Sequence, residues 1–280
     1  MIKIGILHPG EMGISIAASA TNSGHRAYWV SQGRSIKTRG RADEHGLVES
    51  ESILELCETC EIIMCVCPPH AAEEVAKLVI EGGFQGSYLD ANAISPQRAV
   101  RIENMMREHN IHFIDGSIIG GPAWKPGETV LYLSGKDANV IASCFKNGPL
   151  ATKIIGEEVG KASALKMCYA AYSKGTTALL SAILATAESL GVRKELYQQW
   201  DFDDPAFSEQ ANRRVIRAAV KAWRFEGEMQ EVESTFQAAG LPGGFHSAAA
   251  EVYHRMAALK KSSMEHTIDE IIDIIAHGTD

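Results

Sequence analysis

The regular alternation of short apolar runs with helix-like segments in the first half of this 280-residue chain limits its fold more than any other feature. The strand-like runs read IKIGIL, RAYWV, EIIMCVC, SYLDA and IHFID. The segments between them include EMGISIAASATNSG, HAAEEVAKLVIEGG and SPQRAVRIENMMREHN. Strands that alternate with helices through short loops predict a parallel sheet with crossover helices. The run TVLYLSG follows the turn sequence KPGE, and it predicts an antiparallel strand after the parallel ones.

The second half of the chain has a different amino-acid pattern. From Gly160 to Leu190 the sequence is rich in Ala and Leu and contains no proline, which predicts one long, largely buried helix. More helical sequence follows, with a break at LPGGF. We therefore predict an α/β fold, a Rossmann-type doubly wound parallel sheet in residues 1–157, followed by an all-α domain in residues 158–280.

Composition excludes several classes of protein. The net charge of −8 argues against a general nucleic-acid binder. No apolar run is long enough to span a bilayer. The chain starts directly with a short apolar run, without a basic segment or a small-residue cleavage site, which argues against a secretory signal. We expect a cytoplasmic protein with neither nucleic acid nor membrane as a partner.

The cysteine spacing raises the question of a metal site. The chain contains a C-x-x-C at Cys57 and Cys60 and a C-x-C at Cys65 and Cys67. The second pair lies inside the run EIIMCVC, where cysteine behaves as a small hydrophobic residue of a buried strand. We expect no metal, and reduced thiols fit a cytoplasmic protein.

The stretch KIGILHPGEMG resembles a glycine-rich turn between a strand and a helix. In such turns the second glycine lets the backbone approach a pyrophosphate and the third packs the helix on the strand. Gly10 and Gly13 occupy these places, whereas His8 replaces the first glycine, and Pro9 is expected to restrict it to extended conformations. The following helix would offer its N–H groups to a phosphate. The expected cofactor-binding turn comprises His8, Pro9, Gly10, Glu11, Met12 and Gly13.

The loop after RAYWV indicates which dinucleotide is bound. Ser31 stands where an NAD enzyme usually has an acid for the ribose hydroxyls. Four cations follow closely: Arg34, Lys37, Arg39 and Arg41. This favours a 2′-phosphate, and we predict NADP(H) with Ser31, Arg34 and Ser35 at that phosphate. A solvated basic helix face is the alternative, and it accounts for Lys37, Arg39 and Arg41.

Four segments, in this order, resemble one known family: IGILHPGEMGISIAASATNSGH, LDANAISP, DGSIIGGPAWKPGETVLYLSG and VGKASALKMCYAAYSKG. The chain resembles the β-hydroxyacid dehydrogenases, the group of 3-hydroxyisobutyrate and 6-phosphogluconate dehydrogenases, and within it a poorly characterised branch with a short, divergent helical C-terminal domain. The resemblance implies an oxidoreductase that moves a hydride between NADP(H) and a small oxo or hydroxy compound.

We also expect a homodimer built on the helical half. Its long apolar helix needs covering on more sides than about 120 residues can provide.

The resemblance places a catalytic lysine at Lys166. Reduction of a carbonyl leaves an alkoxide that needs a proton, and a lysine ammonium can supply it. On a regular helix Lys166, Tyr169 and Ser173 fall at i, i+3 and i+7, on one face toward the substrate. A structural lysine at a domain junction and a packing tyrosine are the alternatives.

Further residues are expected beside the nicotinamide or the substrate. Several follow strands, at the edge of a parallel sheet where ligands bind. They are Cys67, Pro68, Pro69 and Asn92 for the cofactor, and Ser95, Ile119, Gly120 and Gly121 for the substrate. Plain turns also explain Asn92 and the two glycines. His246 could reach the partner's site in a dimer, although a lone histidine is more often structural.

Two departures from the family pattern leave other functions open. Ile119 stands where the family usually has serine, and Tyr169 where it has asparagine. An imine reductase of the same superfamily is therefore an alternative, although a protonated Lys166 suits an alkoxide and an iminium needs no proton donor. A non-catalytic NADP-binding or redox-sensing protein is the alternative from another class, and it would be expected to have lost Lys166.

Overall fold

The computed structural model describes residues 1–261 and 266–278. It divides into two compact units, Met1–Lys166 and Met167–Asp280. We expected the boundary at residue 157, which lies before α7 (Lys161–Ala170), whereas the two units divide within that helix, after Lys166.

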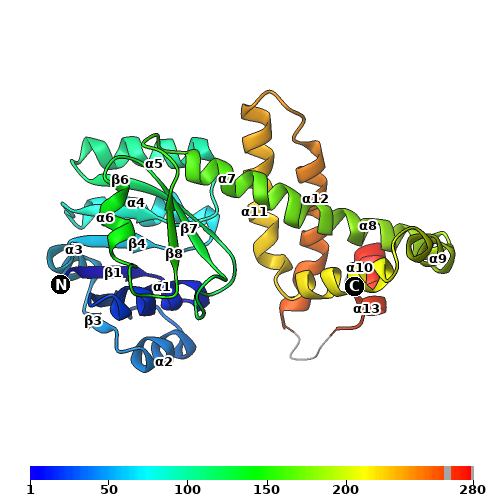
Figure 1. Cartoon of the computed structure of the whole chain (residues 1–280), viewed down its shortest axis with the longest axis horizontal. Helices are drawn as coiled ribbons and strands as arrows, with labels where there is room; N and C mark the ends of the chain where they lie inside the picture. Colours follow the sequence, from blue (N-terminus) through cyan, green and yellow to red (C-terminus); the bar gives the residue numbers. More distant parts are fainter. Residues whose placement is uncertain (262–265, 279–280) are drawn as a thin grey trace. The chain divides into compact units, whose positions relative to one another are not determined.

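The first unit is built on a single sheet. Its strands are β1 (Lys3–Leu7), β2 (Arg26–Val30), β3 (Val48–Ser50), β4 (Ile62–Cys65), β5 (Ser87–Asp90), β6 (His112–Ile119), β7 (Val130–Ser134) and β8 (Ala151–Ile154). In the described part of the chain these eight strands have the order β3-β2-β1-β4-β5-β6-β7-β8 (Figure 1). Neighbouring strands are parallel except β6 and β7, which pair antiparallel. The predicted doubly wound sheet and the antiparallel strand in TVLYLSG are confirmed.

Helices cover both faces of this sheet. The helices of this unit are α1 (Glu11–Asn22), α2 (Ile36–Glu44), α3 (Ile53–Thr59), a 3-10 helix (Pro69–Ala71), α4 (Ala72–Glu81), α5 (Pro96–Glu108) and α6 (Ala138–Ser143), and α7 (Lys161–Ala170) begins in it. The alternating direction of side chains along a strand separates two cores. On β4, Ile62 and Met64 pack with α1 and α6, whereas Ile63 and Cys65 pack with α3, α4 and α5. Burial on both faces explains why the strands read as continuous apolar runs.

The strand order creates one favoured ligand edge. β1 lies between β2 and β4. The strands β2 and β3 extend the sheet on one side of β1, and β4 and the later strands extend it on the other side. Ligands of open parallel sheets bind at such a switch point, beyond the carboxyl ends of the strands. The residues after β1, β4, β5 and β6 share this edge because these strands are parallel.

The apolar pattern missed several elements of the first unit, namely α2, β3, α3, α6 and β8, and α2 was indicated only by the basic helix face considered for Lys37, Arg39 and Arg41. β3 has only three residues, and α2 buries only Ala42 among its nine residues. An element with so little buried surface carries almost no apolar periodicity, so it cannot be recognised by that signal.

The second unit is helical. It contains the end of α7, a π-helical turn (Ala171–Gly175), α8 (Thr176–Ser189), α9 (Arg193–Asp203), α10 (Phe207–Ala219), α11 (Ala222–Ala238), α12 (Gly244–Met256), a 3-10 helix (Ala257–Lys261) and α13 (Ile268–His277) (Figure 1). The predicted break at LPGGF separates α11 from α12. None of the helices in the described residues could cross a membrane, given their length and hydropathy.

The expectation of one largely buried helix from Gly160 to Leu190 needs two corrections. A π-helical turn interrupts the α-helical pattern at Ala171–Gly175. In addition, Leu179 and Leu190 are 60% and 70% exposed, because within this single chain nothing in the described residues packs over that side of the helix.

Candidate functional site

The turn after β1 has the tight conformation that a glycine usually supplies. His8 adopts a φ of 67°, in the left-handed region, so the expected extended conformation is wrong. The Gly10 amide donates a hydrogen bond to the His8 carbonyl at 2.7 Å, which closes a turn around Pro9. The need to end β1 and start α1 within three residues overrides the local preference that Pro9 imposes on His8.

The two glycines of this turn have different roles. A Cβ on Gly13 would lie 2.5 Å from the His8 carbonyl oxygen, so the packing of α1 on the turn requires glycine there. At Gly10 a Cβ would come no closer than 4.0 Å to the described atoms, so the protein itself leaves that space open. The first turn of α1 has no side-chain cap in the described chain. An open Gly10 beside uncapped N–H groups fits a pyrophosphate.

Replacement of these glycines with Ala should separate folding from cofactor binding. Gly13→Ala should lower the free energy of unfolding by about 1–3 kcal/mol, because the Cβ overlaps a backbone oxygen. Gly10→Ala should change it by less than about 0.5 kcal/mol, yet weaken dinucleotide binding because the Cβ enters the pyrophosphate space. Urea unfolding and cofactor titration of both variants measure the two effects. Equal destabilisation by both substitutions would contradict this assignment.

A carboxylate that the sequence did not indicate lies beside the end of β2. The Ser31 hydroxyl donates a hydrogen bond to Glu49 on β3. Arg39 donates to the Ser31 carbonyl at 2.9 Å, and its guanidinium lies 3.9 Å from the Glu49 carboxylate. Although Ser31 itself replaces the usual acid, Glu49 brings an acid back to the same place through the neighbouring strand.

The cations of this region are not equivalent. Arg39 is held by Ser31 and Glu49, and Arg41 lies 3.5 Å from Glu11 at the start of α1. Arg34 is half-buried, and its Nε has no hydrogen-bond partner among the described residues. Burial lowers the pKa of the Arg34 guanidinium, and the nearby thiols of Cys67 and Cys65 act in the opposite direction. Of these three arginines, Arg34 is the one without a carboxylate partner among the described residues, which suits it to a phosphate.

Ser35, predicted beside the same phosphate, is the N-cap of α2. Its hydroxyl accepts a hydrogen bond from the Thr38 amide at 3.2 Å. The predicted basic helix face does exist, since Lys37, Arg39 and Arg41 all lie on α2.

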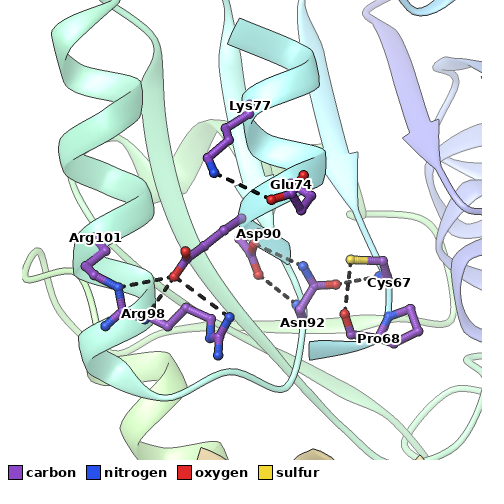
Figure 2. A network of polar contacts seen from close by, with 9 residues as sticks. Cys67, Pro68, Glu74, Lys77, Asp90, Asn92, Arg98 and Arg101 are labelled. Carbon is purple, nitrogen blue, oxygen red and sulfur yellow. Dashed lines mark hydrogen bonds and ion pairs between the residues drawn. The ribbon is translucent and has the colours of Figure 1, made fainter. Parts of the chain in front are cut away.

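A buried polar network joins the ends of β4 and β5 (Figure 2). The Asn92 side chain accepts a hydrogen bond from the Cys67 amide and donates to Asp90 at 3.0 Å. The Asn92 backbone amide also donates a hydrogen bond to the Asp90 carboxylate, at 3.0 Å. Burial raises the pKa of the Asp90 carboxyl well above its usual value, and the bonds from Asn92 oppose this shift. The network braces the loop that continues from Cys67 into Pro68 and Pro69.

Asn92 is only 3% exposed. A direct contact of its side chain with the nicotinamide ribose stays a prediction, and it would require one of these internal bonds to be given up. Ser95 is also buried, where it forms the N-cap of α5 ahead of Pro96. Nearby, Glu73 on α4 pairs with Arg101 at 2.8 Å and Arg98 at 3.8 Å on α5.

The glycine pair after β6 combines a structural and an open position. Gly120 has a φ of 125°, and a Cβ there would lie 2.4 Å from the Glu128 carbonyl. The close approach of β6 and β7 therefore requires glycine at 120. Gly121 has open space in the described structure, and its carbonyl accepts a hydrogen bond from Thr129 at 2.8 Å. Gly121 and the end of β6 at Ile119 remain the positions here where a substrate could approach the backbone.

Lys166 lies against this same strand end. Its ammonium donates to the Ile118 carbonyl at 2.6 Å. The start of α7 is fixed to the sheet by Asp115, a buried residue of β6 that accepts hydrogen bonds from Gly160 and Ser163. A single acid within an otherwise apolar strand run was the sequence signal that could have identified Asp115.

The candidate residues of the second unit lie in different environments. Tyr169 is 49% exposed. The Ser173 hydroxyl donates to the Tyr169 carbonyl at 2.8 Å and lies in the π-helical turn, so the regular i, i+3, i+7 face is interrupted before Ser173.

His246 is 7% exposed and packs edge-on against Phe236, with the ring centroids 4.4 Å apart. Burial lowers the pKa of the His246 imidazole. These contacts favour the structural role for His246, and its reach into a partner's site stays a prediction.

No group of three metal-binding side chains occurs within the described ranges. Cys65 and Cys67 lie with their sulfurs 3.6 Å apart at the end of β4.

Comparison with known proteins identifies the family. Residues 3–147 match the NAD binding domain of 6-phosphogluconate dehydrogenase, and residues 187–256 match a domain of unknown function (DUF1932). The first match covers more than half of the chain, which therefore belongs to the family defined by that NAD-binding domain. The first unit is thus a domain for a nicotinamide dinucleotide, and the chain is an oxidoreductase of this superfamily.

Individual proteins are similar over most of their length. An uncharacterized 28.5 kDa protein of Methanothermus fervidus is 30% identical over 204 residues, which are 72% of this chain and 78% of that protein. The 3-hydroxyisobutyrate dehydrogenase of Salmonella typhimurium has a TM-score of 0.72 at 16% identity and covers 98% of this chain and 100% of its own. An imine reductase from Myxococcus stipitatus in complex with NADP⁺ has a TM-score of 0.57 at 16% identity, with coverage of 98% and 99%.

Proposed function

We propose that the protein is an NADP(H)-dependent oxidoreductase that reduces a small oxo compound, or oxidises the corresponding alcohol, with Lys166 as proton donor or base. The observation that carries this proposal is the Lys166 ammonium at the Ile118 carbonyl, 2.6 Å away, at the carboxyl end of β6. This is the edge of the sheet where the β1, β4 and β5 loops also end.

The chain's own residues account for binding and for proton transfer. The open Gly10 and the start of α1 suit the pyrophosphate, and Arg34 suits a 2′-phosphate. The braced loop from Cys67 to Pro69 would line the space for the nicotinamide, and a bound nicotinamide would supply or accept the hydride. Lys166 then donates its proton to the oxygen of the reduced substrate, or removes a proton in the opposite direction.

A substrate screen tests this function. The purified chain is incubated with NADPH and a panel of oxo acids, aldehydes and cyclic imines, and loss of NADPH absorbance is followed. We expect consumption of NADPH with an oxo compound and a slower reaction with NADH. Consumption with cyclic imines alone would reject oxygen chemistry.

Imine reduction is the second candidate, favoured by Tyr169. This phenol stands where the family pattern has asparagine, and about half of its surface is exposed. The Myxococcus stipitatus imine reductase shares the fold and binds NADP⁺. An iminium accepts hydride without a proton donor, so an imine reductase would depend less on Lys166 than a carbonyl reductase does.

The variant Tyr169→Phe distinguishes the two substrate classes. For a carbonyl substrate, loss of the phenol should cost about one hydrogen bond, roughly 0.5–1.5 kcal/mol in kcat/KM. For an imine held mainly by this phenol, Tyr169→Phe should reduce kcat/KM more than Lys166→Ala does. Steady-state kinetics of both variants on the same substrate decide between these outcomes.

We further propose a homodimer built on the helical unit. Apolar side chains are exposed on several of its helices, among them Leu179 on α8, Leu190 at the C-cap of α8, Phe202 on α9 and Phe245 on α12. Such surface is rarely left in contact with water. Sedimentation at micromolar concentration should give about twice the chain mass of 30.3 kDa. A monomer that retains full turnover would contradict the dimer.

A further inference from the structure

We propose that Asp115 is the positioning residue for Lys166. Its buried carboxylate holds the first turn of α7 against β6 and thereby keeps the Lys166 ammonium at the Ile118 carbonyl. The importance of this position for turnover rests on the proposed function, in which Lys166 transfers the proton.

The Asp115 carboxylate accepts four hydrogen bonds within the first unit. One oxygen accepts from the amides of Gly160 at 2.9 Å and Ser163 at 3.0 Å, and from the Ser134 hydroxyl at 3.0 Å. The other oxygen accepts from the Ser163 hydroxyl at 2.7 Å. A carboxylate that is 1% exposed needs such donors to compensate for the water it has lost. Burial raises the pKa of Asp115, and these bonds act against the shift.

These contacts replace a local cap at the start of α7. The first amides of a helix have no partner inside the helix. Here Asp115 on β6 accepts from Gly160 and Ser163, and Ser134 on β7 accepts from the Ala162 amide at 3.0 Å. The helix start is therefore attached to two strands of the sheet by side chains from those strands. The negative charge also lies at the positive end of the helix dipole, where it is favourable.

The attachment sets where Lys166 can reach. Ser163 and Lys166 are three residues apart and share one face of α7. The helix rises by about 4.5 Å between them, whereas β6 advances about 10 Å from Asp115 to Ile118. The long lysine side chain spans this difference and ends on the Ile118 carbonyl. A helix start released from Asp115 is free to shift along β6, and the ammonium would then lose its defined place.

Lysine acylation tests this positioning without any knowledge of the substrate. The full-length wild type and Asp115→Ala are treated with the N-hydroxysuccinimide ester of acetic acid, and acetylation is quantified by peptide mass spectrometry. Lys77 on α4 and Lys153 on β8 serve as internal references. In Asp115→Ala, Lys166 should react about 2-fold to 10-fold faster relative to these references, the size expected when one hydrogen bond is lost.

Circular dichroism and NADPH titration establish that the variant is folded. If Asp115→Ala does not fold, Ser163→Ala is used in its place. Ser163→Ala removes only the hydroxyl bond to Asp115, so the expected increase in Lys166 acetylation is smaller. Unchanged acetylation of Lys166 in a folded variant would overturn the proposal.

Turnover separates this proposal from the proposed function. With a substrate from the screen, Asp115→Ala should lower kcat while the Kd for NADPH stays unchanged. Faster acetylation of Lys166 in Asp115→Ala, together with full turnover of Lys166→Ala, would support the positioning role and reject proton transfer by Lys166.

Discussion

Replacement of Lys166 with Ala is expected to lower kcat by roughly 10²–10⁴-fold, the usual contribution of a positioned acid or base. NADPH binding should remain intact, because the phosphates are expected at Gly10 and Arg34 and not at α7. The Lys166 ammonium lies 2.6 Å from the Ile118 carbonyl. The alanine side chain has no proton to give to an alkoxide, and neither has the Ile118 carbonyl.

Both kinetic constants must be measured for Lys166→Ala, together with the Kd for NADPH. A rise in KM at constant kcat would indicate lost ground-state binding and not lost proton transfer. Lys166→Arg is the matched control, since it keeps the positive charge but holds its protons too firmly to donate them. If Lys166→Arg restores wild-type kcat, charge alone is sufficient and the proton-donor role is wrong.

Arg34→Ala should weaken NADPH binding by about 1.5–3 kcal/mol, which is the cost of one charge-assisted phosphate contact. This corresponds to roughly 10-fold to 100-fold in Kd. The affinity for NADH should hardly change. The reason is that Arg39 and Arg41 already interact with carboxylates, whereas the Arg34 Nε has no hydrogen-bond partner within the described residues. Fluorescence titration of both cofactors measures the difference, and equal losses for NADPH and NADH would refute it.

Glu49→Gln is the matched variant for this cofactor test. Glutamine keeps an oxygen that can accept the Ser31 hydroxyl bond, but it removes a negative charge from the expected phosphate site. NADPH binding should therefore become about 3-fold to 10-fold tighter, since a like charge nearby opposes the phosphate. If instead Glu49→Gln weakens NADH and leaves NADPH unchanged, Glu49 binds ribose hydroxyls and the protein prefers NAD.

Much of the sheet could be predicted from the sequence because both of its faces are buried. The runs around β1 and β4 are apolar at nearly every position, a pattern that few other arrangements explain. The apolar pattern could not predict the short elements α2 and β3, since they bury too little surface to impose a period, and only the cations of α2 indicated a helix there. Their absence from the prediction also hid Glu49, whose contact with Ser31 exists only because β3 pairs with β2.

The site was predicted best where one residue acts within its own loop. Gly10 and Gly13 were assigned distinct roles from their places in the turn, and their steric surroundings differ accordingly. The extended conformation predicted for His8 was wrong. The rule for residues before proline is local, whereas tertiary structure determines this turn. The sequence could mark Asp115 as an unusual acid in an apolar run, but its partner Ser163 lies 48 positions away, so no local pattern could reveal the contact between them.

A crystal structure of the protein with NADPH and an oxo compound from the screen tests the central claim most directly. We predict the pyrophosphate at Gly10 and the first turn of α1, the 2′-phosphate within hydrogen-bond distance of Arg34, and the substrate oxygen within hydrogen-bond distance of the Lys166 ammonium. NADPH bound away from the β1 turn, or a substrate oxygen that does not contact Lys166, would contradict the account.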